Sequence, residues 1–144
     1  MCGIAGIIGN VPPDRNILNK LLESISHRGR DHRGFFYENK MMFGMNRLSI
    51  LDLKNGNQPI QTEDGRYVII FNGEIYNYKE LKREIAAKYV FKTNCDTEVI
   101  LAGYSLFGKD FFKKLNGIYA IALWDGLKKK LTLSRDPRGV KPLY

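Results

Sequence analysis

Apolar and polar positions along this chain follow two rhythms, one typical of strands and one typical of helices. Short apolar stretches rich in β-branched or aromatic residues predict strands over 2–8, 35–38, 42–47, 67–71, 118–125 and 130–135. Apolar residues at helical spacing predict helices that begin after Asp14, at Asn77 and at Asp96. Both kinds of element therefore contribute to one core.

The ends of the predicted helices carry recognisable signals. Asp14 can cap the first helix, because a short carboxylate accepts hydrogen bonds from the free N–H groups of a first turn. That helix ends near Gly29, and its apolar stripe consists of Ile17, Leu18, Leu21, Leu22 and Ile25. The second helix runs to Lys88. Asp96 is predicted as the cap of the third helix and Gly108 as its end.

The order of the elements predicts the fold class. Strands occur in pairs, around Asn39-Lys40 and across Gly126, with helices inserted in blocks between them. This order favours an α+β fold over a strict strand–helix alternation. The 144 residues suit one domain, 1–144, with a single core. Because the segment 141–144 resembles the start of another strand, we expect the chain to be a fragment, truncated within its last strands.

Composition excludes several classes of protein. Hydrophobic residues make up 44% and charged residues 26%, as in ordinary globular domains. No apolar run approaches the roughly 20 residues that cross a bilayer, and the apolar N-terminus has no basic leader. We therefore expect a cytoplasmic protein without a membrane partner.

The formal net charge of +8 raises the question of a nucleic-acid partner. The basic residues are dispersed, however, and the densest run, 128–130, lies in a predicted hairpin turn. No basic stripe alternates with aromatic residues as single-strand binding requires. Small anionic substrates or an acidic partner domain are better explanations of the charge, and we expect no nucleic-acid binding.

The two cysteines differ in position. They form no disulfide framework, and with His27 and His32 they lack the clustered spacing of a zinc site. Cys95 is predicted to be a small core residue. Cys2 follows the initiator methionine, so removal of Met1 would place a thiol nucleophile and a free α-amine, with a reference pKa of about 7.7–8.0, on one residue.

Five further residues suit the binding of an amide substrate with a zwitterionic end. Asn72 and Gly73 follow a predicted strand and offer two adjacent donors to an oxyanion, although Asn-Gly is also a common turn. Arg47 offers a planar fork suited to a carboxylate. Glu74 and Asp96 are acceptors suited to an ammonium group. Taken singly, these residues also fit a surface arginine and a helix cap.

Several ordered motifs together resemble the class II glutamine amidotransferase domain, most closely that of glutamine-hydrolysing asparagine synthases. The motifs are MCGIAGIIG at 1–9, HRG with Asp31 at 27–31, RLSI at 47–50, NGEIYN at 72–77, CDTE at 95–98, GIYAIALWD at 117–125 and RDPRGVKPLY at 135–144. The resemblance implies an N-terminal-nucleophile hydrolase fold, with four layers (αββα) and two antiparallel sheets.

The resemblance also implies roles for individual residues. Cys2 would be the nucleophile, Asn72 and Gly73 the oxyanion hole, Arg47 the partner of the glutamine α-carboxylate, and Glu74 with Asp96 the partners of its α-ammonium. The rest of the expected glutamine pocket is Leu48, Ser49, Ile50 and Leu51. No metal or cofactor is expected in this domain, whereas ATP and Mg²⁺ would serve a C-terminal synthase domain of the same chain, in which the ammonia makes asparagine.

The chain departs from the family pattern in two respects, at Arg30 and in lacking the synthase half, and several alternatives for its function stay open. Arg30 stands where the family usually has proline after His-Arg-Gly, which frees a backbone that proline would fix. The same domain also serves surface-polysaccharide and sugar-phosphate amidotransferases. A non-catalytic interaction domain is a further alternative, and a homodimer is possible.

Overall fold

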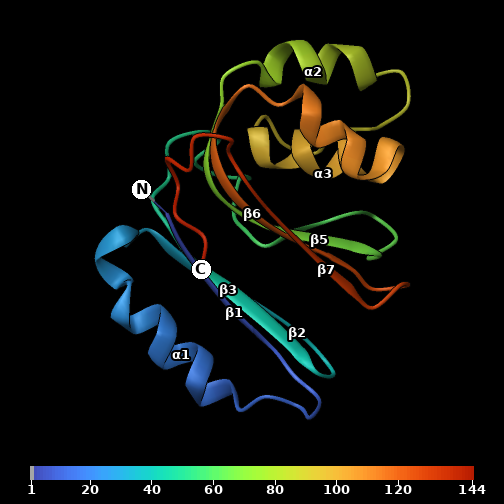
Figure 1. The fold of residues 1–144 in the computed structure, drawn as a ribbon. Coiled ribbons are helices and arrows are strands. Elements are labelled where there is room, and N and C mark those ends of the chain that lie inside the picture. Colours follow the sequence, from blue (N-terminus) through green and yellow to red (C-terminus); the bar gives the residue numbers. More distant parts are fainter. Residues whose placement is uncertain (1) are drawn as a thin grey trace.

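A computed structural model describes residues 2–144 and contains two antiparallel sheets (Figure 1). The strands are β1 (Gly3–Ile8), β2 (His32–Glu38), β3 (Met41–Arg47), β4 (Ile60–Gln61), β5 (Tyr67–Ile75), β6 (Gly117–Asp125) and β7 (Lys130–Arg135). The helices are α1 (Arg15–Ser24), α2 (Tyr78–Ile85) and α3 (Asp96–Phe107), with 3₁₀ turns η1 (Ser26–Arg28) and η2 (Gly108–Lys114). One sheet has the order β1-β3-β2 and the other β4-β5-β6-β7.

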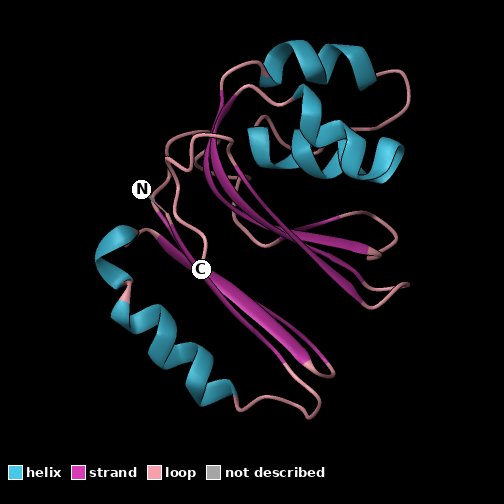
Figure 2. Cartoon of the chain, in the orientation of Figure 1, coloured by secondary structure: helices cyan, strands magenta, loops and turns pink. Residues whose placement is uncertain are grey.

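The two sheets face each other and each carries helices on its outer face. Figure 2 shows α1 beside the three-stranded sheet and α2 with α3 beside the four-stranded sheet. The layers therefore follow the order αββα, and the predicted α+β class with antiparallel sheets is confirmed. Among residues 2–144, no helix is both long enough and apolar enough to span a bilayer.

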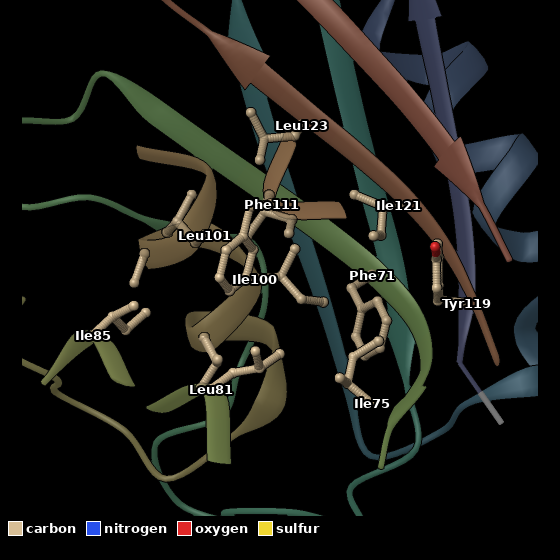
Figure 3. Close-up of a cluster of buried hydrophobic side chains, with 13 residues drawn as sticks. Phe71, Ile75, Leu81, Ile85, Ile100, Leu101, Phe111, Tyr119, Ile121 and Leu123 are labelled. Carbon is tan, nitrogen blue, oxygen red and sulfur yellow. The ribbon is translucent and has the colours of Figure 1, made fainter. Parts of the chain in front are cut away.

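Alternating side chains of β5 bind the layers together. One set, which includes Ile69 and Phe71, packs with β6 against α2 and α3 (Figure 3). The other set, Val68 and Ile70, faces the opposite sheet and meets Met45 of β3. A strand with both faces covered must be apolar on both, and this explains the continuous apolar run that predicted β5.

The predicted helix α1 has the expected cap, since the Asp14 carboxylate accepts a hydrogen bond from the N–H of Asn16 at 2.9 Å. Leu18 and Leu22 are fully buried against β3, whereas Ile17 and Leu21 stay partly exposed. Of the four stripe residues within α1, Leu18 and Leu22 therefore reach the core, and Ile17 and Leu21 do not.

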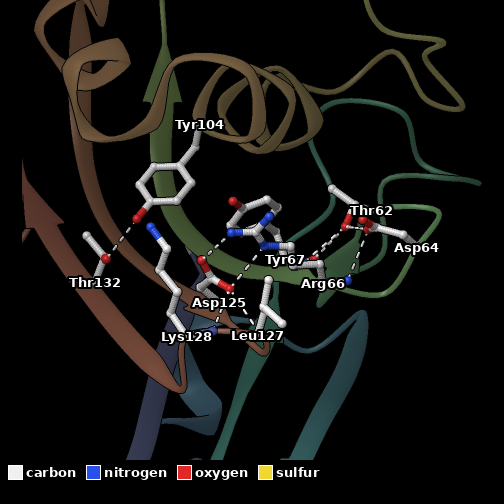
Figure 4. Close-up of polar contacts among 9 residues, drawn as sticks. All are labelled: Thr62, Asp64, Arg66, Tyr67, Tyr104, Asp125, Leu127, Lys128 and Thr132. Atoms are coloured by element: carbon white, nitrogen blue, oxygen red, sulfur yellow. Dashed lines mark hydrogen bonds and ion pairs between the residues drawn. The ribbon is translucent and has the colours of Figure 1, made fainter.

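A polar cluster closes the Tyr67 end of β5 (Figure 4). The Arg66 guanidinium donates to both carboxylate oxygens of Asp125, at 3.2 and 3.1 Å. The same carboxylate accepts the backbone N–H groups of Leu127 and Lys128 in the β6–β7 turn. These contacts fix the hairpin that the sequence predicted across Gly126.

Several sequence predictions were wrong in detail. Strand β5 does not stop at Asn72 but continues to Ile75, because β6 pairs with it over that whole length. Asp96 is not a cap but the first residue of α3, and its carboxylate accepts a hydrogen bond from another element. The second helix ends at Ile85, short of Lys88. No strand forms over 141–144. Cys95 is buried, as predicted.

Candidate active site

A cavity of about 180 Å³ opens where the second half of β5, the start of α3 and the loop after β3 meet. The predicted residues that line it are Cys2, Arg47, Leu48, Ile50, Leu51, Asn72, Gly73, Glu74 and Asp96. Ser49 alone among the predicted residues is not in the lining. Its backbone N–H instead donates to the Asp31 carboxylate at 2.7 Å, which holds the loop to the HRG segment.

The backbone of β5 decides which N–H groups face this cavity. In an antiparallel strand, successive N–H groups point to opposite edges. The N–H of Tyr76 bonds to Asn116 just beyond β6, so the even-numbered N–H groups point to that side. The N–H groups of Phe71 and Ile75 point the other way, and side chains accept both: Gln58 Oε1 at 2.7 Å and Asp96 Oδ2 at 3.1 Å.

Gly73 lies between those two paired positions, so its N–H points to the same edge and into the cavity. Residues 2–144 supply no acceptor for it. Glycine is required here for a steric reason, since a Cβ at Gly73 would lie 2.0 Å from the carbonyl oxygen of Ile118 on β6. The residue therefore combines tight strand packing with a free backbone donor.

The side chain of Asn72 adds a second donor. The residue is 5% exposed, yet its amide group forms no hydrogen bond with any described residue. Among the described residues, His32 Nδ1 is the one buried side-chain nitrogen or oxygen without a hydrogen-bond partner, so the unpaired Asn72 amide keeps access to the cavity and its solvent. Two adjacent free donors in a small cavity are therefore available to a ligand oxygen.

Asp96 provides the buried acid of the site. Burial raises its pKa from 3.8 to about 6, although backbone hydrogen bonds from Ile75 and Thr97 oppose the change, and nearby Glu74 adds a smaller increase. Within residues 2–144 the carboxylate forms no salt bridge. A bound cation would therefore relieve an existing electrostatic cost. Glu74 itself is exposed at the rim.

Arg47 is buried at 3% exposure, and its guanidinium is already partly engaged. Its Nη1 group donates to Asn57 Oδ1 at 2.7 Å, and its Nη2 group donates to the carbonyls of Leu51 and Asp52. These bonds fix the loop 48–57 around the end of β3. Arg47 thus shapes the cavity wall and retains N–H groups for a carboxylate, since a guanidinium carries five.

Cys2 is half-buried at the edge of the cavity, where its thiol lies 3.7 Å from the carbonyl oxygen of Leu48. Arg28 holds the residue in place, because its Nε donates to the Cys2 carbonyl at 3.0 Å. The expected removal of Met1 falls outside the described residues. Arg30 is exposed, and the loop around it is held by its neighbours, as the N–H of Asp31 bonds to the Arg47 carbonyl.

The cavity also contains residues that the sequence did not predict: Gly56, Gln58, Phe71, Cys95, Thr97, Ile118 and Lys141. Two polar side chains of this group form a hydrogen bond, in which Gln58 Nε2 donates to Thr97 Oγ1 at 3.2 Å. Nothing in the local pattern marks Gln58, whereas Thr97 lies within the CDTE motif. In the described part of the chain, no group of three or more His, Cys, Asp or Glu side chains is arranged to hold a metal ion.

Comparison with known proteins agrees with this geometry. Residues 1–144 match the family described as glutamine amidotransferase domain. The whole chain is 43% identical to asparagine synthetase [glutamine-hydrolyzing] 1 of Bacillus subtilis and 37% identical to asparagine synthetase B [glutamine-hydrolyzing] of Escherichia coli. It covers 24% and 26% of those proteins, so it spans about a quarter of their length.

A solved structure shows the same fold. Glutamine phosphoribosylpyrophosphate amidotransferase from B. subtilis superposes with a TM-score of 0.81 over 96% of this chain and 38% of its own, at 21% identity. At that identity the likeness establishes the fold, while the family match and the curated relatives establish descent. The chain belongs to the glutamine amidotransferase domain family and is related to the asparagine synthetases.

Proposed function

We propose that this domain hydrolyses the side-chain amide of glutamine to glutamate and ammonia at Cys2. The thiolate attacks the amide carbon, and Asn72 and Gly73 donate to the oxygen that becomes negative. The carbon–nitrogen bond then breaks as the nitrogen takes a proton, and ammonia leaves. Water attacks the resulting thioester, which releases glutamate and restores the thiol.

One observation carries the proposal: the Asn72 amide and the Gly73 N–H, two donors without a partner among residues 2–144, share a small cavity with a half-buried thiol. Donors without a protein partner can bond to a substrate oxygen as charge develops on it, because no other bond has to break first. Arg47 and Asp96 supply opposite charges at the same cavity. Such a pair matches the α-carboxylate and α-ammonium of an amino acid.

The base in this proposal is the α-amine of Cys2. A free α-amine has a pKa of about 7.7–8.0, close to working pH. Its formation requires removal of Met1, because an amide nitrogen is not basic. Glutamate release from glutamine, followed in a sample whose intact mass lacks Met1, tests the reaction. If a folded sample that lacks Met1 and whose Cys2 is unmodified formed no glutamate, the proposal would be contradicted.

We further propose that the ammonia serves ATP-dependent asparagine synthesis in a longer chain. The support is the names of the relatives above and their length, about four times that of this chain. ATP and Mg²⁺ would bind in that synthase part. A surface-polysaccharide or sugar-phosphate amidotransferase is the alternative acceptor system. Reading the residues that follow Tyr144 separates them, since an ATP-pyrophosphatase phosphate loop supports the synthase and a sugar-isomerase domain contradicts it.

A further inference from the structure

Gln58 occupies the junction of three elements that build the cavity. The residue is 5% exposed, and it belongs to the loop that connects β3 to β4. Its main chain lies against β2, where a Cβ on Gly34 would stand 1.8 Å from the Gln58 carbonyl oxygen. Its side chain leaves that anchored position and reaches two other elements.

One end of the side chain holds β5 beside the oxyanion donors. Gln58 Oε1 accepts the Phe71 N–H at 2.7 Å. That N–H belongs to the residue before Asn72, and it points to the same strand edge as the Gly73 N–H. β4 pairs with β5 only at Val68 and Ile69, so beyond those residues side chains replace a neighbouring strand at this edge.

The other end holds the start of α3. Gln58 Nε2 donates to Thr97 Oγ1 at 3.2 Å, and Thr97 is 2% exposed. Thr97 directly follows Asp96, whose carboxylate in turn accepts the N–H of Ile75 at 3.1 Å. The Gly73 N–H therefore lies between two side-chain acceptors, and Gln58 connects the strand that carries it to the helix that carries the acid.

We propose that Gln58 is a positioning residue that fixes the Gly73 N–H and the Asn72 amide relative to Asp96 by bridging β5 and α3. This inference rests on the proposed glutaminase function. Displacing a catalytic group by about 1 Å can reduce a rate on the order of 100-fold. Gln58→Met keeps the size of the side chain and removes both bonds, so it should lower kcat by about 10- to 100-fold.

A matched control exists at the other end of the same strand. Thr62 Oγ1 accepts the Tyr67 N–H at 3.0 Å, so Thr62→Val also removes a side-chain acceptor from β5 but lies outside the cavity. Thr62→Val should lower the melting temperature and leave kcat within about twofold of the wild type. Equal kcat values for Gln58→Met and Thr62→Val would overturn the positioning role.

A double-mutant cycle with Asn72→Ala adds a readout that loss of stability does not change. If Gln58 acts through the oxyanion donors, the two kcat losses overlap and the double variant is little worse than Asn72→Ala alone. Fully additive losses would overturn the proposal. If Gln58→Met does not fold, Thr97→Val removes only the contact of Gln58 with α3. Thr97→Val should raise KM for glutamine, and Thr97→Ser, which keeps the hydroxyl group, should have the KM of the wild type. An unchanged KM for Thr97→Val would overturn the proposal.

Glutamate release by the wild type and the effect of Gln58 on the backbone are measured in separate experiments. If folded wild-type protein without Met1 releases no glutamate, that proposal fails, and the bridge is judged from backbone amide resonances in solution. A Gln58→Met spectrum in which the Gly73 and Thr97 amide signals shift, while those of residues around Thr62 do not, supports the bridge. Unchanged Gly73 and Thr97 signals overturn it.

Discussion

The two ends of the β5–β6 pair contain similar polar groups in opposite states. At the Tyr67 end, Asp125 receives two bonds from Arg66 and two from backbone N–H groups of the following turn. At the Ile75 end, the Asn72 amide and the Gly73 N–H have no partner among residues 2–144. The first end is complete as folded, whereas the second has donors available for a ligand.

Two carboxylates show the same contrast. Burial alone would raise the pKa of Asp125, but the bond from Arg66 and the backbone N–H groups outweigh it and lower the pKa. For Asp96, burial outweighs the backbone bonds and raises the pKa to about 6. A carboxylate with a raised pKa beside unpaired donors is typical of functional sites, and this agrees with the proposed place of the substrate.

Cys2→Ala should have the largest effect on the reactive end, with glutaminase activity falling to background because the thioester cannot form. Cys95 is the matched control, since burial raises the pKa of its thiol and disfavours the thiolate. A glutamine-like diazo-ketone should label Cys2 alone, as mapped by mass spectrometry. Label on Cys95, or none on active protein, would contradict the assignment.

Retention of Met1 should be almost as severe, because it converts the Cys2 amine into a non-basic amide. The intact mass and glutamate release are measured on the same sample. Strong activity in protein that keeps Met1 would show that another group acts as the base.

Asn72→Ala should lower kcat by about 10²–10³-fold, as loss of an oxyanion donor does elsewhere, with little change in KM. Arg47→Ala should instead chiefly raise KM for glutamine, because its proposed partner, the α-carboxylate, does not change charge during the reaction. Steady-state kinetics of the two variants separate the roles. The reverse pattern would mean that the assignment is wrong.

The pKa of Asp96 predicts a smaller, pH-dependent effect. Below about pH 6 the carboxyl group becomes neutral and no longer attracts an α-ammonium, so KM should rise as the pH falls through 6. A raised pKa also means that folding loses stability as the pH rises from about 4 to 6, because only the unfolded state then releases its proton. Asp96→Asn should remove this dependence in thermal unfolding, and an unchanged profile would refute the shift.

Changes at the closed end should affect activity least. Asp125→Ala removes the acceptor of Arg66 and of two turn N–H groups, so it should reduce the free energy of unfolding by about 1–2 kcal/mol. Its kcat and KM at 25 °C should match the wild type, since none of these groups lines the cavity. A loss of kcat in a fully folded sample would show that the two ends are coupled.

Local patterns in the sequence determined the main strands and helices, although not all of their ends, and most residues of the candidate site. The apolar run of β5 and the cap at Asp14 are readable because strand and helix periodicities involve residues two to four positions apart. Cys2, Arg47, Asn72, Gly73 and Asp96 were named from chemistry and resemblance, and the structure places them around one cavity. Local patterns could not show that the polar groups at the Tyr67 end of β5 are paired, whereas those at its Ile75 end are not.

Tertiary structure alone decided which polar groups are paired. The local pattern left open whether Asn72 and Gly73 form a turn or supply two donors, and pairing with β6 keeps them in a strand and directs the Gly73 N–H to the cavity edge. Gln58 contacts Phe71, 13 residues away, and Thr97, 39 residues away. No periodicity encodes such contacts, because they depend on how a loop, a strand and a helix pack together.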